Sequence, residues 1–493
     1  MRKRKVTALI LALTMAAGAL TGCGGSSDKK ADSDKGGQGD KEVVNLKIHT
    51  LIPEQKDQKE VMEALNEYTK EKIGVTVDYV FHGSSYADKI QVIIASGEEY
   101  DACFTSNWIN AYNTNVAKGA FMDIKDLLPE AAPELYETLP ESFWQAATVN
   151  GGIYAVPNQQ IAARQIGALM PKEFVDKAGV NIDELHTLTD LKEYAKSAKD
   201  NFEAKVGGVN RSQAADYCGY EYISDYLSAG AVKMGDDKAK VVNFYETDEW
   251  KSMLYELSDL NKEGLLDGQC GYMDEYSESQ RKGKKTSAFY SGTYKPGVEA
   301  EESTRAGYEM VFAKGSVEPL INTNSVIATM YAVSNTSKHP EETLKYLELV
   351  NTDPYVMNLL SYGIEGKHYE KISDNMIKPA ADSGYSHGQA WALGNVFNSY
   401  ALEGQPEDVW EQTAAINDSA NVSPLIGFSF DPEPVKMEIA SVSKVVKEYE
   451  SLVGGELPVD ETNAEFTEKL KVAGLDDVLA EMQSQVDTFM ESK

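Results

Sequence analysis

The sequence contains few cysteines, which form disulfides, and few histidines, which with cysteine most often bind transition metals. Four cysteines and six histidines occur among 493 residues, without Cys-x-x-Cys or His-x-x-x-His spacing. Three cysteines follow residue 23, so we expect either small apolar side chains or one disulfide with one free thiol at Cys103, Cys218 and Cys270. We therefore expect neither a metal site nor a cofactor.

Positive charge is also scarce. Lysine and arginine number 47 against 78 aspartates and glutamates, which gives a net charge of −31. A chain of this charge repels phosphate groups, so nucleic acids and anionic lipid headgroups are not expected as partners, whereas a neutral or cationic solute is compatible with it. With 42% hydrophobic residues, the chain is long enough for two or three domains with sizeable cores.

Beyond the first 22 residues the sequence has no long apolar run. A basic segment, Arg2 to Lys5, precedes the apolar segment Ala8 to Leu20, which is short for a membrane-spanning helix and leads into Leu20-Thr21-Gly22-Cys23. This arrangement resembles a bacterial lipoprotein signal peptide over residues 1–22, which implies that Cys23 is lipidated. The alternative is an ordinary secretory leader with a chance cysteine. Residues 23–42 are rich in Gly, Ser, Asp and Lys and predict a flexible linker, and the rest of the chain is expected to be soluble.

The residues after the linker carry an α/β pattern. A strand over Val43 to Leu51, a helix over Lys59 to Ile73 and a strand over Val75 to Phe81 are expected to form a βαβ unit. Loops that follow parallel strands lie at one edge of the sheet, so His82, Tyr86 and Trp108 are candidate solute contacts. For Trp108, packing against the protein is an equal alternative. Further helices are expected over 172–178, 188–198 and 220–227.

The stretch from Gly151 to Gln160 is where polar side chains follow a short strand. Ile153 to Val156 is rich in strand formers, and Pro157 ends the strand because proline cannot donate a hydrogen bond to a neighbouring strand. The amides of Gln159 and Gln160, with Arg164 beyond them, can donate to and accept from a hydroxyl-rich or amide-rich solute. An ordinary hairpin with a polar exit is the alternative.

Several segments resemble family 1 extracellular solute-binding proteins of ABC importers. The Gly-Gly-Ile-Tyr-Ala-Val-Pro run from Gly151, the helix behind Thr247 with Trp250 on its apolar face, and the run from Leu359 to Tyr369 are similar to signatures of that family, in a lipoprotein subset. The resemblance implies an α/β, two-lobed, type II periplasmic-binding-protein-like fold, in which each lobe is a mixed sheet flanked by helices and three strands form a hinge. A C-terminal helical module of unassigned function is implied as well, and we expect it to brace one lobe.

The expected division of the chain follows from this resemblance. One lobe takes residues 43–156 with about 330–370, the other takes 157–328 with part of 371–430, and the helical module takes 431–493. The chain is expected to cross between the lobes near 154–158, 328–334 and 427–434.

Two later segments supply further candidate contacts. Tyr290 ends a predicted strand that begins at Lys285, and Tyr294 lies in the glycine-bearing loop after it, which suits the close approach of a solute. The segment from Gln389 to Asn395 resembles the Trp…Gly-Asn segment that lines the cleft in the family, which implies Trp391 as a stacking residue. The full candidate set is His82, Tyr86, Trp108, Gln159, Gln160, Arg164, Tyr290, Tyr294, Trp391 and Asn395.

A match to the Gly-x-Ser-x-Gly motif of serine hydrolases occurs at Gly384 to Gly388. A nucleophile elbow needs a buried strand before the serine, and in α/β-hydrolases the histidine follows it, but the preceding residues are no such strand and no histidine follows His387. A glycoside hydrolase would need two carboxylates that flank the sugar bond, and nothing in the sequence singles out such a pair. We therefore expect no enzyme and no catalytic residue.

The sequence thus predicts a monomeric binding protein, lipid-anchored on the extracytoplasmic face of a bacterial membrane. It would capture a small polar solute by closing its hinge and deliver the solute to an ABC permease. Tryptophan and tyrosine number 32 against 14 phenylalanines, which favours an oligosaccharide. Peptides or other small polar solutes remain alternatives, as do a glycoside hydrolase and a surface adhesin from other functional classes.

Overall fold

The βαβ unit expected at the start of the folded chain is present. In the computed structural model, which describes residues 43–291 and 293–493, β1 (Val44–Thr50), α1 (Gln58–Ile73) and β2 (Val75–Phe81) follow one another, and the two strands pair in parallel. Gly74 ends α1 in the left-handed conformation, with φ 72°, and its N–H donates to the carbonyl of Lys70. Glycine adopts this conformation without steric cost, which is why the helix ends there as predicted.

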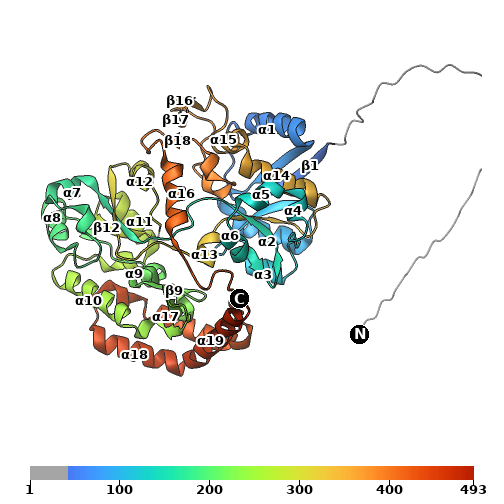
Figure 1. The fold of residues 1–493 in the computed structure, drawn as a ribbon. Helices are drawn as coiled ribbons and strands as arrows, with labels where there is room; N and C mark the ends of the chain where they lie inside the picture. Colours follow the sequence, from blue (N-terminus) through green and yellow to red (C-terminus); the bar gives the residue numbers. More distant parts are fainter. Residues whose placement is uncertain (1–42, 292) are drawn as a thin grey trace, which may run out of the picture. The chain divides into compact units, whose positions relative to one another are not determined.

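The first sheet has five strands in the order β2-β1-β3-β15-β6 and is mixed. Three of its strands, β2, β1 and β3 (Ala102–Thr105), are parallel, whereas β15 (Met330–Val333) runs antiparallel to β3 and to β6 (Ala155–Pro157). Figure 1 shows the helices that surround this sheet. They are α2 (Tyr86–Ser96), α3 (Tyr112–Ala117), α4 (Leu128–Ala131), α5 (Pro133–Thr138), α6 (Glu141–Ala147), α14 (Pro340–Thr352) and α15 (Pro354–Tyr362), with the short hairpin β4 (Thr148–Val149) and β5 (Gly152–Ile153).

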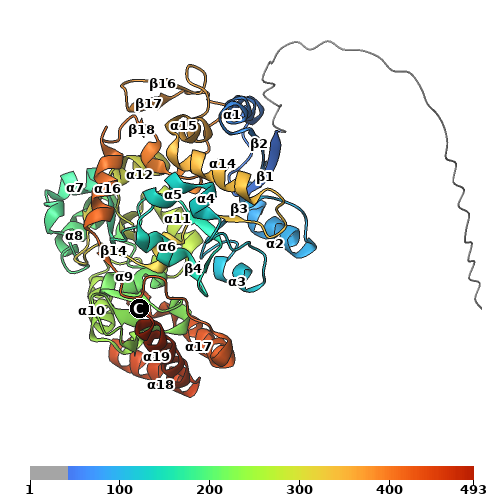
Figure 2. The ribbon, with the colours of Figure 1, turned by 45° about the vertical axis from the view of Figure 1, so that its right-hand side comes forward.

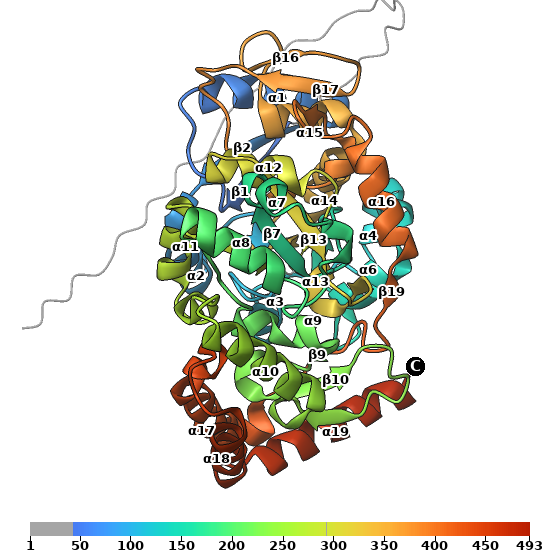
Figure 3. The same ribbon diagram turned by 90° about the vertical axis from the view of Figure 1, so that its left-hand side faces the viewer.

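The second sheet has four strands in the order β13-β7-β12-β8, again mixed. Its strands are β7 (Gly167–Pro171), β8 (Lys205–Val206), β12 (Thr286–Ser291) and β13 (Met310–Lys314). Figure 3 shows β7 and β13 behind the helices of this part. The accompanying helices are α7 (Lys172–Ala178), α8 (Lys192–Phe202), α9 (Ala214–Cys218), α10 (Asp248–Lys262), α11 (Asp274–Lys282) and α12 (Val298–Ala306). The expected two-sheet α/β architecture is thus confirmed.

One expected helix is wrong. Residues 220–227 form β9 (Tyr220–Tyr222) and a short turn, and β9 lies in a separate three-stranded sheet with β10 (Gly230–Lys233) and β11 (Val241–Asn243). The aromatic residues of β9 favour a strand when a partner is present, and β10 supplies that partner. The helix α10 is as expected, because the hydroxyl of Thr247 accepts a hydrogen bond from the N–H of Trp250 and caps it.

Buried apolar side chains form two large clusters. The first draws on residues 46–163 and 321–396 with Ile426, and the second on 166–313 with 425 and 435–486. These clusters support the proposed division into two lobes, but the lobe boundaries remain a proposal. Part of 371–430 was expected with the second lobe, whereas Tyr385, Leu393 and Val396 belong to the first cluster.

Three extended passages connect the two clusters. Arg164 forms an antiparallel bridge with Leu320, and β14 (Leu320–Ile321) pairs in parallel with β19 (Asn421–Val422). A three-strand connection was expected, and its strands lie several residues from the expected places. The segment 330–333 looks like a crossing strand in the sequence, but it is β15, between β3 and β6. The helix α13 (Thr323–Val326) follows the second passage and leads to β15, and α16 (Val409–Ser419) precedes the third passage.

The C-terminal helices pack on the second cluster. Figure 2 shows α17 (Lys436–Glu448), α18 (Val459–Val472) and α19 (Leu475–Glu491) together beside α10. The indole N–H of Trp250 on α10 donates to Asn463 on α18 at 2.9 Å. A Cβ added at Gly230 would lie 2.3 Å from the sulfur of Met482, so α19 approaches β10 very closely. The helices therefore share a core with α10 and the three-stranded sheet, and their role as a brace remains a prediction.

The proposed signal peptide over 1–22, Cys23 and the linker over 23–42 lie outside the described residues. Within the described residues no helix combines the length and apolarity needed to cross a membrane. Cys103, Cys218 and Cys270 are buried free thiols rather than partners in a disulfide.

Candidate functional site

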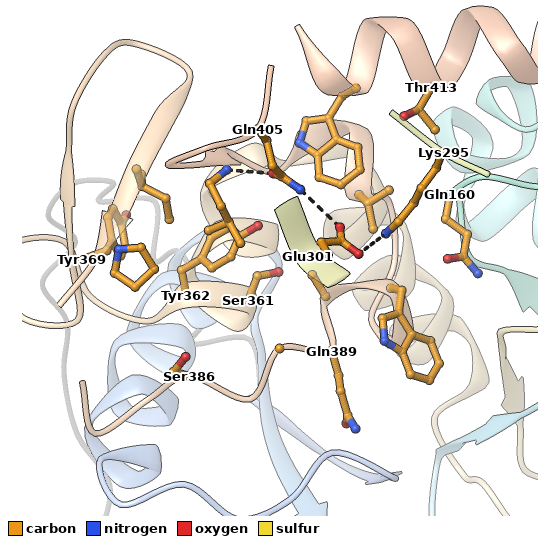
Figure 4. Close-up of a pocket in the computed structure, with 18 of the residues that line it drawn as sticks. Gln160, Lys295, Glu301, Ser361, Tyr362, Tyr369, Ser386, Gln389, Gln405 and Thr413 are labelled. Carbon is orange, nitrogen blue, oxygen red and sulfur yellow. Dashed lines mark hydrogen bonds and ion pairs between the residues drawn. The ribbon is translucent and has the colours of Figure 1, made fainter. Parts of the chain in front are cut away.

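A cavity of about 380 Å³ lies between elements of the two clusters. One wall of the cavity is formed by residues between 361 and 391, in the part of the chain that contributes to the first cluster. The opposite wall is formed by α12 and the loop before it, and α12 packs against strands of the second sheet. The rest of the lining comes from the first crossing passage, from α16 and from residues between 396 and 405. Figure 4 shows the lining side chains from these elements around one space. The volume is within the range of small-molecule sites in proteins, and such sites commonly form between domains.

Two tryptophans line the cavity. Trp391 lies in a short 3-10 turn, and its ring centroid is 6.2 Å from that of Phe104 and 6.3 Å from that of Trp108. The Trp108 indole donates to the carbonyl of Ala328 at 2.8 Å, which fixes its ring. The other lining tryptophan, Trp410, comes from α16. Amphipathic aromatic rings of this kind suit a solute with both apolar faces and polar edges.

Three neutral polar atoms of lining residues have no hydrogen-bond partner among the described residues. They are Oγ of Ser361, Oε1 of Gln389 and Nε1 of Trp410. A buried donor or acceptor without a partner costs about 1–3 kcal/mol. The lining therefore offers both a donor and acceptors that a polar solute, or a rearrangement around one, could satisfy.

The charged residues of the cavity are paired with one another. The Lys295 ammonium is 2.9 Å from one carboxylate oxygen of Glu301, and the Gln405 amide donates to the other oxygen at 3.2 Å. Figure 4 shows Glu301 between these two side chains. One turn along α12, Arg305 lies 2.6 Å from Glu302. Gln405 follows β18 (Ala401–Leu402), which pairs with β17 (Met376–Pro379) and through it with β16 (Tyr369–Lys371), so its bond to Glu301 spans the cavity.

Two of the candidate residues, Gln160 and Trp391, line the cavity. A third candidate, Trp108, packs against the ring of Trp391. The Gln160 side-chain amide donates to the hydroxyl of Thr329, and the backbone carbonyl of Gln160 accepts from the side chain of Asn417 on α16. The role of these three side chains in binding remains a proposal.

Three other candidates lie at the crossing passages. Gln159 forms a parallel bridge with Asn395, and the Asn395 side chain accepts from the N–H of Phe397 and donates to the carbonyl of Asn351. Arg164 is paired with Asp216 at 2.6 Å. These three residues lie along the connecting backbone, and none of them lines the cavity.

The remaining candidates pack inside the two lobes. Tyr86 is fully buried and its hydroxyl donates to the carbonyl of Phe104. A ring nitrogen of His82 is 2.9 Å from one of His49. Tyr290 packs edge-to-face on Tyr217, and Tyr294 lies 5.1 Å from the ring of Phe312. None of these four lines the cavity.

Sequence reasoning did not find several lining residues. Gln405, Trp410 and Glu301 lie in segments without a recognisable motif, and Ser361 lies in the family-like run from Leu359 to Tyr369, which does not mark it as a contact. Only tertiary packing brings these residues together. Gln389 was in the segment that resembles the family's cleft lining, so that resemblance was the one signal available.

The histidine of the hydrolase-like motif, His387, is engaged by the backbone on both of its ring nitrogens. Nε2 of His387 is 2.9 Å from the carbonyl of Leu360, and Nδ1 accepts from the N–H of Gln389. Burial lowers the pKa of His387, and both nitrogens are occupied, so the ring is not placed as a base for Ser386. Among the described residues no group of three metal-ligating side chains gathers in one place.

Comparison with known proteins gives consistent matches. The sequence profile of the bacterial extracellular solute-binding proteins matches residues 53–357, and that of a domain of unknown function, DUF3502, matches 424–491. A carbohydrate ABC transporter substrate-binding protein of Streptococcus pneumoniae is 30% identical over 98% of this chain and 97% of its own length. Lipoprotein LipO of Bacillus subtilis is 23% identical over 73% of each chain.

A solved structure is similar over most of the fold. The N-glycan transport solute-binding protein NgtS of Streptococcus pneumoniae superimposes with a TM-score of 0.81 at 25% identity, over 91% of this chain and 99% of that chain. Its complexes with Man1GlcNAc and Man5GlcNAc give TM-scores of 0.74 and 0.70, each over 91% of this chain.

Proposed function

Because the chain belongs to the bacterial extracellular solute-binding proteins, we propose that it captures an oligosaccharide in the cavity between its two lobes and delivers it to an ABC permease. The similarity to a carbohydrate transporter protein and to an N-glycan-binding protein supports this class of solute.

The observation that carries the proposal is the composition of the cavity. It combines tryptophan rings with neutral donors and acceptors that lack partners among the described residues. A sugar ring has C–H faces that pack on an indole and hydroxyl groups that both donate and accept. Peptides also carry donors and acceptors, but they present no repeated ring face for Trp391 and Trp410.

Binding would proceed by closure of the lobes. The lining comes from both lobes, and the chain passes between them three times. A solute that contacts both sides favours the closed arrangement, because only there are all its contacts made at once. The lower TM-scores of the two NgtS sugar complexes, at equal coverage of this chain, are what a rearrangement of the lobes around a sugar would produce.

The carboxylates of the cavity do not suit sugar hydrolysis. A glycosidase places two carboxyl groups on opposite sides of the scissile bond, about 5–9.5 Å apart. Here the lining carboxylates are Glu301 and Glu302, which are consecutive on α12, and each is paired with a cation. We therefore propose capture without cleavage.

The anchor is also part of the proposal. The lipoprotein-like leader, Cys23 and the linker over 23–42 would hold a monomeric folded unit at the outer face of the membrane, and the similarity to lipoprotein LipO supports it. Growth with a labelled fatty acid should label the wild-type protein and leave Cys23→Ala unlabelled.

A calorimetric screen tests the function. Residues 24–493, which contain the whole folded unit, would be titrated with Man1GlcNAc, Man5GlcNAc, other oligosaccharides and short peptides, and each mixture would be analysed afterwards by mass spectrometry. We expect one sugar per chain and unchanged sugar. Binding of peptides alone would contradict the sugar class, and cleaved sugar would contradict the carrier role.

A further inference from the structure

The cations that face the cavity are already neutralised by carboxylates of the same wall. Among the described lining residues these cations are Lys295 and Arg305, apart from histidine, and they pair with Glu301 and Glu302 respectively. The Lys295 and Glu301 side chains are 23% and 38% exposed, so this ion pair is partly shielded from solvent. Glu301 is therefore the main electrostatic partner of the Lys295 ammonium.

Glu301 is held on both of its oxygens. Lys295 binds one oxygen, the Gln405 amide binds the other, and the Gln405 carbonyl in turn accepts from the backbone N–H of Leu402. The start of α12 is packed tightly against the same segment, since a Cβ at Gly297 would lie 3.2 Å from Val409 and 3.3 Å from Gln405. The carboxylate therefore cannot turn away from the cavity without breaking contacts on both sides.

The binding of a sugar that carries a carboxylate would be opposed by electrostatic repulsion from the cavity lining. Its negative charge would face Glu301, and its natural partner Lys295 would be available only if the existing pair were broken. Removing one partner of a partly shielded ion pair leaves the other charge without its partner, which is unfavourable. The net charge of −31 on the whole chain acts in the same direction at longer range.

A neutral sugar is not repelled by Glu301. The unpartnered atoms of the lining, on Ser361, Gln389 and Trp410, are uncharged donors or acceptors and match hydroxyl or acetamido groups. From this arrangement we infer that Glu301 is a specificity-determining residue, which makes the cavity select neutral oligosaccharides and reject those with a carboxylate. The inference rests on the proposed function, since it concerns the same cavity.

The test compares neutral and anionic forms of one disaccharide. Man1GlcNAc would be titrated beside two derivatives, one with the mannose C6 oxidised to a carboxylate and one with the reducing GlcNAc oxidised to the aldonic acid. For the wild-type protein we expect both derivatives to bind at least about tenfold more weakly than the neutral sugar, because a single unfavourable charge contact of this kind is worth a factor of ten or more.

The variant Glu301→Gln keeps the shape of the side chain but removes its charge and releases Lys295. The ratio of neutral to anionic affinity should then fall by about tenfold or more for at least one derivative, since Lys295 can form a charge-assisted hydrogen bond with the added carboxylate. Binding of that derivative should weaken as NaCl rises, because salt screens the new ion pair. Adding Lys295→Gln to the variant should abolish the gain.

The matched control is Glu193→Gln. It removes the same charge from an 81% exposed side chain on α8, where Glu193 pairs with Lys196 and does not line the cavity, and it should leave the ratio unchanged. If the wild-type protein binds neutral and anionic sugars equally, or if Glu301→Gln leaves the ratio as it was, the inference fails while the proposed function stands. If the folded protein binds none of the three sugars, both fail together.

Discussion

Nη2 of Arg164 lies 2.6 Å from Oδ2 of Asp216, and this ion pair ties the first crossing passage to α9 of the second lobe. The backbone of Arg164 also exchanges two hydrogen bonds with Leu320 of the second passage, at 2.8 and 3.0 Å. The residue was expected to contact a solute, and the structure gives its side chain another partner. Its position suggests a role in fixing the strands that connect the lobes.

A double-mutant cycle on this pair tests that role. Arg164→Met leaves the carboxylate of Asp216 enclosed without a partner, and should lower the free energy of unfolding by about 2 kcal/mol. Asp216→Asn should restore part of this loss in the double variant, because no charge then remains without a partner. Urea unfolding of the four proteins gives the coupling energy, with Glu193 and Lys196 on the surface as a control pair worth less than about 1 kcal/mol. A coupling energy near zero for Arg164 and Asp216 would exclude this role.

Trp391 is expected to provide the main stacking surface for the solute. Trp391→Ala removes the indole from the cavity and should weaken oligosaccharide binding by about tenfold or more, measured by calorimetry, with little change in melting temperature. Tyr136→Ala, at a 40% exposed aromatic residue outside the lining, serves as the control and should bind as the wild type does. Equal losses in both variants would show that the effect is not local to the cavity.

The buried carboxyl of Glu221 should make stability depend on pH. Burial raises its pKa from 4.5 to about 6, hydrogen bonds from Ser423 and Asn322 oppose the shift, and Asp216 adds to it. Between these two values the folded protein binds more protons than the unfolded chain, so this contribution is fully present below pH 4.5 and is lost as the pH rises through 6. The loss is about 2 kcal/mol.

The variant Glu221→Gln cannot titrate, so it should gain about 2 kcal/mol relative to the wild type between pH 4.5 and 7. Urea unfolding at both pH values measures this difference directly. A difference between the two proteins that stays constant with pH would contradict the assignment.

The C-terminal helices should be necessary for the second lobe to fold. Asn463 accepts a hydrogen bond from the indole of Trp250 and donates to the carbonyl of Tyr245 at 3.1 Å. Asn463→Ala leaves both groups buried without partners and should cost about 2 kcal/mol or more of unfolding free energy. Thr488→Ala, an exposed residue of α19 whose hydroxyl bonds within its own helix, is the control.

Removal of residues 424–493 is the stronger form of the same experiment. It uncovers the apolar side chains that α17, α18 and α19 bury against the second cluster, and the product should be insoluble or lack a cooperative unfolding transition. A soluble, truncated chain with an unchanged melting temperature would show that the second lobe folds without the module.

The sequence allowed the local parts of this fold to be predicted. The helix ended by Gly74 and the helix capped by Thr247 follow from interactions within a few residues, and both are confirmed. The residues at 220–222 were placed in a helix because their partner strand, β10, comes later in the chain and cannot be seen from local pattern.

The residues that line the cavity were harder to predict from the sequence. Trp391 was found through a resemblance, whereas Trp410 and Glu301 join it only because α16 and α12 dock against the same space. Tyr86 has the residue type and position of a contact, but its hydroxyl reaches a carbonyl inside the core. Which polar residue faces a cavity depends on packing between segments far apart in the chain.

The central claim is that the space between the two lobes binds an oligosaccharide. The most direct test is calorimetric titration of the wild-type protein and of Ala390→Trp with Man1GlcNAc and Man5GlcNAc, since Ala390 lines the cavity and a larger side chain there would fill it. The account predicts that the wild type binds one sugar per chain and that the filled variant, with its melting temperature preserved, binds none. Undiminished binding by the filled variant, or no binding by the folded wild type, would contradict it.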